Sequence, residues 1–288
     1  MGLLKTFTKT ILIALILLIT TKGVTFADGG FPVRPGRLLI SPSISYFFAS
    51  SQWDSTGIKK PFANGGKYTS FGGTLYSEYG INRSFAAVAS LPFVYNQYTQ
   101  NTAPRSTNSS GLTDLETGIR YYLANIDFIY YFSLQGTAIT PLYSNNASLG
   151  YGKEGGELKL AFSGSAPIGD LSCYFNAADG VRQYFGGNNG PIQNRWNATF
   201  GLSLDEEFSN QVSATLSGIN SWSNDKSFVS ALPETNKNFS FIQASLSYGH
   251  SFTHEISLFL SGGEFLTGKN TGVGTTVSLA FIYRLDYR

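Results

Sequence analysis

The chain has 288 residues, of which 42% are hydrophobic, 15% are aromatic and only 13% are charged. A soluble domain usually carries about 25% charged residues, so this composition disfavours an ordinary soluble fold. The first 27 residues hold three lysines and no acid, which leaves 17 basic and 18 acidic residues in the remaining 261. Such a balance excludes the basic surface of a nucleic-acid-binding protein.

The N-terminus has the pattern of a secretory signal peptide. Lys5 and Lys9 precede an apolar run from Ile11 to Ile19, and Thr25-Phe26-Ala27 offers small residues where a signal peptidase cleaves. A helix that spans a membrane needs about 20 apolar residues, so this run is too short to be an anchor. We therefore predict that residues 1–27 direct export.

After this segment, apolar and polar residues alternate with period two in twelve stretches. Side chains of a strand point alternately to opposite faces, so the alternation predicts strands with one apolar face. Most stretches have about ten residues, the length that a tilted strand needs to cross a bilayer. The predicted strands are Leu38–Ser51, Tyr68–Tyr79, Phe85–Asn96, Thr113–Leu123, Phe128–Thr137, Glu157–Ala166, Leu171–Tyr184, Arg195–Leu204, Val212–Ile219, Phe239–Tyr248, Glu255–Phe265 and Val273–Arg288. The tenth changes phase near Ile242, which predicts a bulge.

The predicted connections alternate between short and long, as in outer-membrane barrels with short periplasmic turns and longer external loops. The short turns are Gly80–Ser84, Ala124–Asp127, Pro167–Asp170, Asp205–Asn210 and Ser251–His254. The long loops are Asp54–Gly66, Tyr98–Leu112, Leu142–Gly156, Phe185–Ile192, Ser221–Lys237 and Thr267–Gly272.

Strands within hydrocarbon can pair every backbone N–H and C=O group only by closing into a barrel. We therefore predict an all-β fold, a 12-stranded antiparallel transmembrane β-barrel over residues 38–288, preceded by a short periplasmic segment over 28–37. A periplasmic β-sandwich or lipocalin-like barrel is the alternative, but it does not require strands so uniform or loops so unequal.

Aromatic residues are placed where the two membrane interfaces are expected, as in the aromatic girdles of such barrels. Those near the short turns are Tyr79, Tyr121, Phe128, Tyr283 and Tyr287, and those near the long loops are Trp53, Tyr95, Trp196 and Phe239.

The opposite phase of the strands predicts the residues that line the interior. Its charged members are Asp114, Glu116, Glu157, Lys159 and Arg195 toward the long loops, with Arg182 a further candidate, and Glu78, Arg120, Arg284 and Asp286 toward the periplasm. Small polar residues lie between these charges. A barrel of eight strands is filled by its side chains and one of sixteen encloses a water channel, so a barrel of twelve strands with small interior side chains favours a narrow passage. Alternatively, these charges form cross-strand pairs that stabilise the barrel.

Candidate catalytic and metal-binding residues are few. His250 and His254 both fall near a predicted periplasmic turn, whereas a hydrolase of external substrates needs its base near the long loops. One cysteine and two histidines cannot form a structural zinc site. Gly150–Gly156 lacks the serine or threonine and the helix of a phosphate-binding loop. We predict no enzymatic activity and no cofactor.

Three segments resemble the outer-membrane proteins of the "MetA-pathway of phenol degradation" family, which is distantly similar to fatty-acid-transporter barrels. They are Tyr46–Gly57, Leu75–Asn82 and Gly111–Tyr121, and they include the Glu-Tyr-Gly-Ile and Gly-Leu-Thr-Asp-Leu-Glu-Thr-Gly-Ile-Arg-Tyr sequences. The resemblance implies transport of small, hydrophobic or aromatic compounds. Glu78, Asp114, Glu116 and Arg120 are the charged residues within it. Only about ten residues, Asp28 to Arg37, lie between the predicted signal peptide and the first predicted strand, which is too few for the plug of a fatty-acid transporter.

Together these patterns predict a passive channel in the outer membrane of a Gram-negative bacterium. Its expected partners are outer-membrane lipid, a small solute and the barrel-assembly machinery during insertion. A closed structural or surface-interaction barrel is the main alternative, and an outer-membrane barrel hydrolase is the third.

Overall fold

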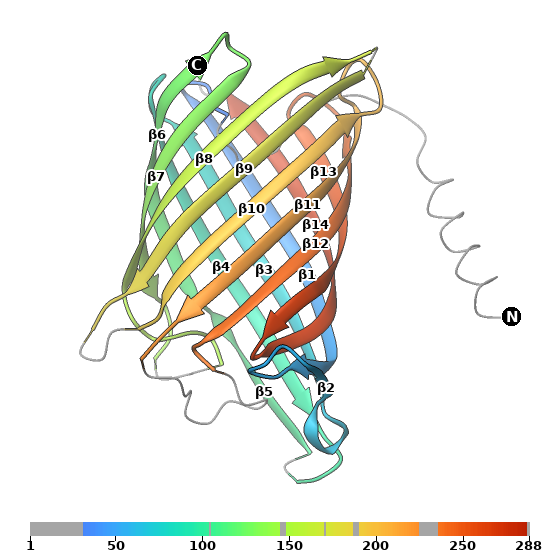
Figure 1. The fold of residues 1–288 in the computed structure, drawn as a ribbon. Helices are drawn as coiled ribbons and strands as arrows, with labels where there is room; N and C mark the ends of the chain where they lie inside the picture. The colour runs from blue at the N-terminus through green and yellow to red at the C-terminus, as the bar shows by residue number, and fades with distance from the viewer. Residues whose placement is uncertain are drawn as a thin grey trace, which may run out of the picture.

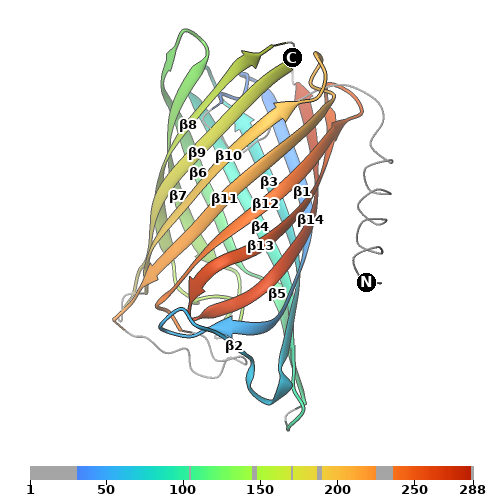
Figure 2. The same ribbon diagram turned by 45° about the vertical axis from the view of Figure 1, so that its right-hand side comes forward.

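The computed structural model describes residues 31–103, 105–144, 148–169, 171–186, 190–224 and 236–286. Twelve long antiparallel strands close into a tilted barrel, with short turns at one end and longer connections at the other (Figures 1 and 2). The predicted fold class is confirmed. The predicted signal peptide, residues 1–27, lies outside the described residues.

The barrel strands are β1 (Arg37–Trp53), β3 (Lys67–Gly80), β4 (Phe85–Thr99), β6 (Asp114–Ile126), β7 (Tyr130–Pro141), β8 (Gly155–Ile168), β9 (Leu171–Tyr184), β10 (Ile192–Ser203), β11 (Asn210–Trp222), β12 (Phe239–Ser251), β13 (Ile256–Lys269) and β14 (Thr271–Asp286). Beyond the long-loop end, β2 (Lys59–Pro61) pairs with β1 and β5 (Ser106–Leu112) pairs with β4. The short 3-10 helix η1 (Ala63–Gly65) lies between β2 and β3.

Closure of the barrel depends on the first and last strands. β1 pairs with β14 from Arg37 opposite Asp286 to Trp53 opposite Thr271, with one register shift near Ser51. Every barrel strand therefore has a hydrogen-bonded neighbour on both sides, which satisfies the backbone polar groups that hydrocarbon cannot. In the described part of the chain no helix is long and apolar enough to cross a membrane.

The alternation in the sequence becomes two different surfaces. The outward-facing side chains of Ile44, Leu158 and Leu246 are 49%, 59% and 71% exposed. This exposure is expected of side chains that contact lipid in the membrane. Ser163, Ser203 and Ser257 point inward and are buried. The interior is thus built largely of small polar side chains, as the alternation predicts.

The last three strands contain a register shift and a tight connection. The β12–β13 register shifts between Ile242 and Gln243, at the position where a bulge is predicted, but the prediction has the wrong strand, because the extra residue is Leu266 of β13. The predicted long loop Thr267–Gly272 is wrong. β13 and β14 extend further and are joined by Asn270 alone, which adopts a positive φ of 50° that asparagine tolerates.

At the short-turn end, residues before β1 cross the strand ends rather than extend away. The Gly36 N–H donates to the Gly80 carbonyl oxygen at 2.8 Å, and the Val33 N–H donates to the Tyr122 hydroxyl at 3.0 Å. The described part of the predicted periplasmic segment is therefore anchored to β3 and β6.

Candidate functional site in the barrel interior

A cavity of about 580 Å³ occupies the barrel interior. It extends from Phe241, near the long-loop end of β12, to Ile282, near the short-turn end of β14. Serine and threonine hydroxyls line much of it, including Ser41, Ser43 and Thr74. Their small volume is what leaves space in a barrel of twelve strands.

The wall of the cavity formed by β6–β10 is charged. Of the residues predicted from the sequence, Glu116, Glu157, Lys159 and Arg195 line the cavity there. The opposite wall, formed by β1, β3 and β12–β14, carries hydroxyls together with the apolar side chains of Phe241, Phe259 and Ile282. A molecule inside the barrel would therefore face a charged wall on one side and a mostly hydroxyl and apolar wall on the other.

Toward the short-turn end, Glu78 and Arg120 form a buried ion pair. The Arg120 Nη1 group donates to both carboxylate oxygens of Glu78 at 3.0 Å, and the Tyr122 hydroxyl also donates to this carboxylate, at 3.1 Å. The remaining guanidinium groups donate to the amide oxygen of Gln135 at 2.9 and 3.0 Å. This network joins strands β3, β6 and β7 along one wall of the interior, over the intervening β4.

Toward the long-loop end, Arg182 of β9 is the centre of a second network. Its guanidinium donates to Glu116 at 2.6 Å and to Glu157 at 2.7 Å, and Arg195 adds a contact to Glu157 at 3.1 Å. Arg182 is only 4% exposed, so both carboxylates compensate a buried charge.

Asp114 is held by two tyrosines at the external side of this network. The Tyr143 hydroxyl donates to it at 3.0 Å and the Tyr184 hydroxyl at 3.3 Å. Tyr143 lies in the β7–β8 loop, and burial raises its pKa, so the hydroxyl remains a donor at neutral pH.

The two remaining predicted residues lie near the periplasmic end. Arg284 is buried and donates to the Ser257 hydroxyl at 3.1 Å. Asp286 lies at the rim, where Arg37 binds it at 2.5 Å. The charged residues predicted to line the interior are thus joined mainly in two networks, with Arg284 and Asp286 apart from both.

An aromatic cluster narrows the interior near the long-loop end. The ring centroids of Phe47 and Phe265 are 5.4 Å apart, and those of Phe241 and Phe265 are 4.7 Å apart. This cluster is not evident from the alternation of residues, because Phe241 and Phe265 flank the register shift between β12 and β13. The roles of Gln135 and Tyr143 are not evident from the sequence either. Gln135 meets Arg120 through the register of β6 and β7, and Tyr143 reaches Asp114 from the β7–β8 loop.

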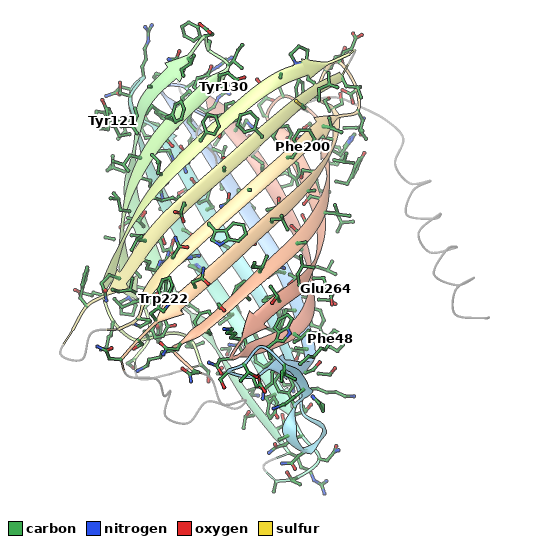
Figure 3. The ribbon with its side chains drawn as sticks, in the orientation of Figure 1. Phe48, Tyr121, Tyr130, Phe200, Trp222 and Glu264 are labelled. Carbon is green, nitrogen blue, oxygen red and sulfur yellow. The ribbon has the colours of Figure 1, made fainter. Side chains whose placement is uncertain are left out.

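One predicted interface residue is corrected. Trp53 is only 7% exposed, too buried for a lipid-facing anchor; a Cβ atom placed on Gly268 would lie 2.7 Å from its ring. By contrast, Trp222 is 56% exposed at the long-loop end of β11, and Tyr121 and Tyr130 lie near the short-turn end (Figure 3).

The structure places both histidines at the short-turn end. His250 Nδ1 lies 2.9 Å from Asn210 Oδ1, and His254 belongs to the β12–β13 turn. Among the described residues, no group of three or more His, Cys, Asp or Glu side chains could hold a metal ion.

Comparison with known proteins identifies the class of fold. No protein-family model matches the sequence, and no curated protein matches it significantly. An outer membrane channel from Pseudomonas putida F1 superposes with a TM-score of 0.66 at 12% identity, covering 91% of this chain and 100% of that one. The beta domain of the Bordetella autotransporter Brka superposes with a TM-score of 0.51 at 13% identity, covering 85% and 99%. Identities this low show the fold alone: this chain has the twelve-stranded barrel fold of outer-membrane proteins.

Proposed function

We propose that this chain is a passive channel for small solutes in the outer membrane of a Gram-negative bacterium. The observation that carries the proposal is the cavity of about 580 Å³ along the barrel interior. Hydroxyl groups on its walls can replace water around a passing solute at little cost. The structural similarity to an outer membrane channel agrees with this role.

The two unlike walls favour solutes that combine a polar group with an apolar body. Lys159 and Arg195 offer hydrogen-bond donors on one side, and Phe241, Phe259 and Ile282 offer apolar contacts on the other. Small hydrophobic or aromatic compounds with a hydroxyl or carboxyl group meet both requirements. This agrees with the solutes implied by the resemblance to the phenol-degradation family, whose membership stays a prediction.

We propose that residues 1–27 are a signal peptide, that the barrel-assembly machinery inserts residues 38–288, and that the outer face contacts outer-membrane lipid. Of the charged residues predicted from the sequence, Glu116, Glu157, Lys159 and Arg195 would set solute selectivity, because they line the cavity.

A closed structural barrel is the second candidate, and a specific observation favours it. The Glu78–Arg120 network occupies the inner face of one wall near the periplasmic end, and the Phe47–Phe241–Phe265 cluster narrows the external end. If each of them blocks the passage at its own end, the cavity is a sealed chamber and the barrel conducts nothing.

Single-channel recording with a matched pair of cysteine variants tests the proposal. In a Cys173→Ala background, Ser43→Cys places a thiol in the cavity, whereas Ile44→Cys places it on the outer face, where Ile44 is 49% exposed. We expect stable open steps from the refolded, signal-free protein, and block by a charged methanethiosulfonate reagent in Ser43→Cys alone. A folded barrel without open steps would contradict the channel and favour the closed barrel.

A further inference from the structure

The outer face of the barrel is hollowed over β10–β14. A groove of about 720 Å³ is lined by small residues, Ala198, Ala214, Ala244 and Gly262, between the larger Phe200 and Leu246. These residues share the outward phase of the strands, and Phe200 and Leu246 are 47% and 71% exposed. The groove is therefore on the membrane side of the wall and at the level of the hydrocarbon.

The external edge of this outer groove is marked by Glu264. The Thr275 hydroxyl donates to its carboxylate at 2.7 Å, and Thr275 pairs with Phe48 of β1. Figure 3 places Glu264 and Phe48 toward the long-loop end of the barrel, whereas Phe200 lies nearer the short-turn end. The outer groove thus runs inward from the external interface.

Beyond this edge lie exposed lysines of β2 and of the end of β13, here called the lysine cluster: Lys59, Lys60 and Lys269. Lys269 ends β13, five residues beyond Glu264, or about 15 Å at the usual rise per strand residue. A Cβ atom on Gly57 would lie 3.9 Å from the Lys269 side chain, so the β1–β2 turn packs against Lys269. From Asp54 to Lys67 the sequence has three lysines and one acid, and that acid is bound by Lys60 at 2.5 Å.

An apolar groove with cations about 15 Å beyond its edge suits an amphipathic molecule that has an apolar chain at one end and an anionic group at the other. We propose that this surface binds a phosphorylated lipid of the outer leaflet, with an acyl chain in the outer groove and the phosphate at the lysine cluster. Each lysine at a membrane surface attracts anionic headgroups. Glu264 repels a phosphate from the groove itself, so it fixes the headgroup at the depth of the lysines.

Charge disfavours a second copy of this chain as the occupant. A copy related by a twofold axis would bring its own lysine cluster toward the same interface, where like charges repel. The lipid also agrees with the position of the β1–β2 turn, because Lys59 of β2 pairs with Trp53 at the end of β1 and a Cβ atom on Gly57 would lie 3.9 Å from the Lys269 side chain.

Native mass spectrometry of the detergent-solubilised barrel tests the proposal. The probes are phosphatidic acid, whose headgroup is a phosphate monoester, and phosphatidylcholine with the same chains. We expect phosphatidic acid to bind more tightly. Lys59→Ala with Lys269→Ala should weaken it by about 10- to 30-fold, because two surface cations are lost. Soluble glycerol 3-phosphate should not compete, since it lacks the chain.

The groove is tested by filling it. A Cβ atom on Gly262 meets no atom within 4 Å, so Gly262→Leu occupies the outer groove without a clash. We expect it to weaken binding of both lipids. The matched control is Gly136→Leu, an exposed glycine of β7 whose Cβ also meets no atom within 4 Å. Arg83→Ala with Arg105→Ala is the charge-matched control for the lysines, because both side chains are exposed away from the groove.

Equal binding of the two lipids, unchanged by Gly262→Leu and by the lysine variant, would overturn the proposal. So would a lipid-free dimer that Gly262→Leu dissociates, because the occupant would then be a second copy. Neither result depends on whether the barrel conducts ions.

Discussion

Arg120 of β6 binds Glu78 of β3 at 3.0 Å although β4 lies between the two strands. The pair forms across Ala86, which stands directly opposite Arg120 on β4 and is fully buried. A methyl group is small enough to let the guanidinium pass over it. The ion pair therefore depends on a third residue that has no charge.

Breaking this pair on one side should destabilise the barrel more than removing both partners. Arg120→Met leaves Glu78 as a buried charge and should cost about 3–5 kcal/mol, and Glu78→Gln should cost a similar amount. Arg120→Met combined with Glu78→Gln should cost clearly less than the two effects together. Urea unfolding in vesicles measures the coupling; additive effects would contradict a direct pair.

Neutralising Arg182 should change ion selectivity. Arg182→Gln removes the nearer of the two cations that Glu116 and Glu157 share, so the interior gains negative charge. If the barrel conducts, the reversal potential in a salt gradient should shift toward cation selectivity. Arg83→Gln, in the exposed β3–β4 turn, should not shift it, and an equal shift in both variants would argue against a role for Arg182 in the passage.

The aromatic cluster should limit flow at the external end. Phe265→Ala removes the ring that contacts both Phe47 and Phe241, so it should raise single-channel conductance. Lost aromatic packing should also lower stability, by about 1–2 kcal/mol for this partly exposed ring. Phe200→Ala is the control, because it removes an aromatic ring from the outer face and should leave conductance unchanged.

The β10–β11 turn should contribute a pH-dependent part of stability through Asp205. Burial opposes its ionisation, but the N–H groups of Ser209, Asn210 and Glu207 and the Asn210 amide outweigh it and lower the pKa. A lowered pKa stabilises the fold above the ordinary aspartate value near 3.9, and this stabilisation is lost as pH falls through the folded value.

Asp205→Asn should therefore lower the free energy of unfolding by about 1 kcal/mol at pH 7. The difference from the native sequence should shrink below about pH 4. Unfolding in vesicles across this range measures it. Asp127→Asn, in the β6–β7 turn, is the matched control; a constant difference for Asp205→Asn at all pH values would refute the electrostatic account.

Strand positions were predictable because the membrane imposes a strict alternation on each strand. Leu158 and Leu160 alternate with Glu157 and Lys159, so one strand reveals both faces without knowledge of its neighbours. The end of β13 was not predictable in the same way. Beyond the bilayer the alternation is no longer required, so Thr267–Gly272 has the composition of a loop although its strands continue.

The candidate site was predictable as a set of residues but not as a set of contacts. Glu116 and Arg182 are 66 positions apart, and their pairing depends on the register of the three ladders that connect β6 to β9. A shift of one residue in any ladder would turn one of them outward. The sequence therefore indicates which charges face inward, whereas the fold decides which of them meet.

The seam between β1 and β14 has a consequence for how the molecule forms. Arg37 and Asp286 meet across it although 249 positions separate them, so the sheet stays open at both edges until the last strand is present. Contacts so distant in sequence make folding slow, because the entropy of a long chain is lost before they form. An unclosed sheet exposes two unpaired edges, the usual start of aggregation. Losing β14 should therefore harm the yield of folded protein far more than its share of the chain suggests.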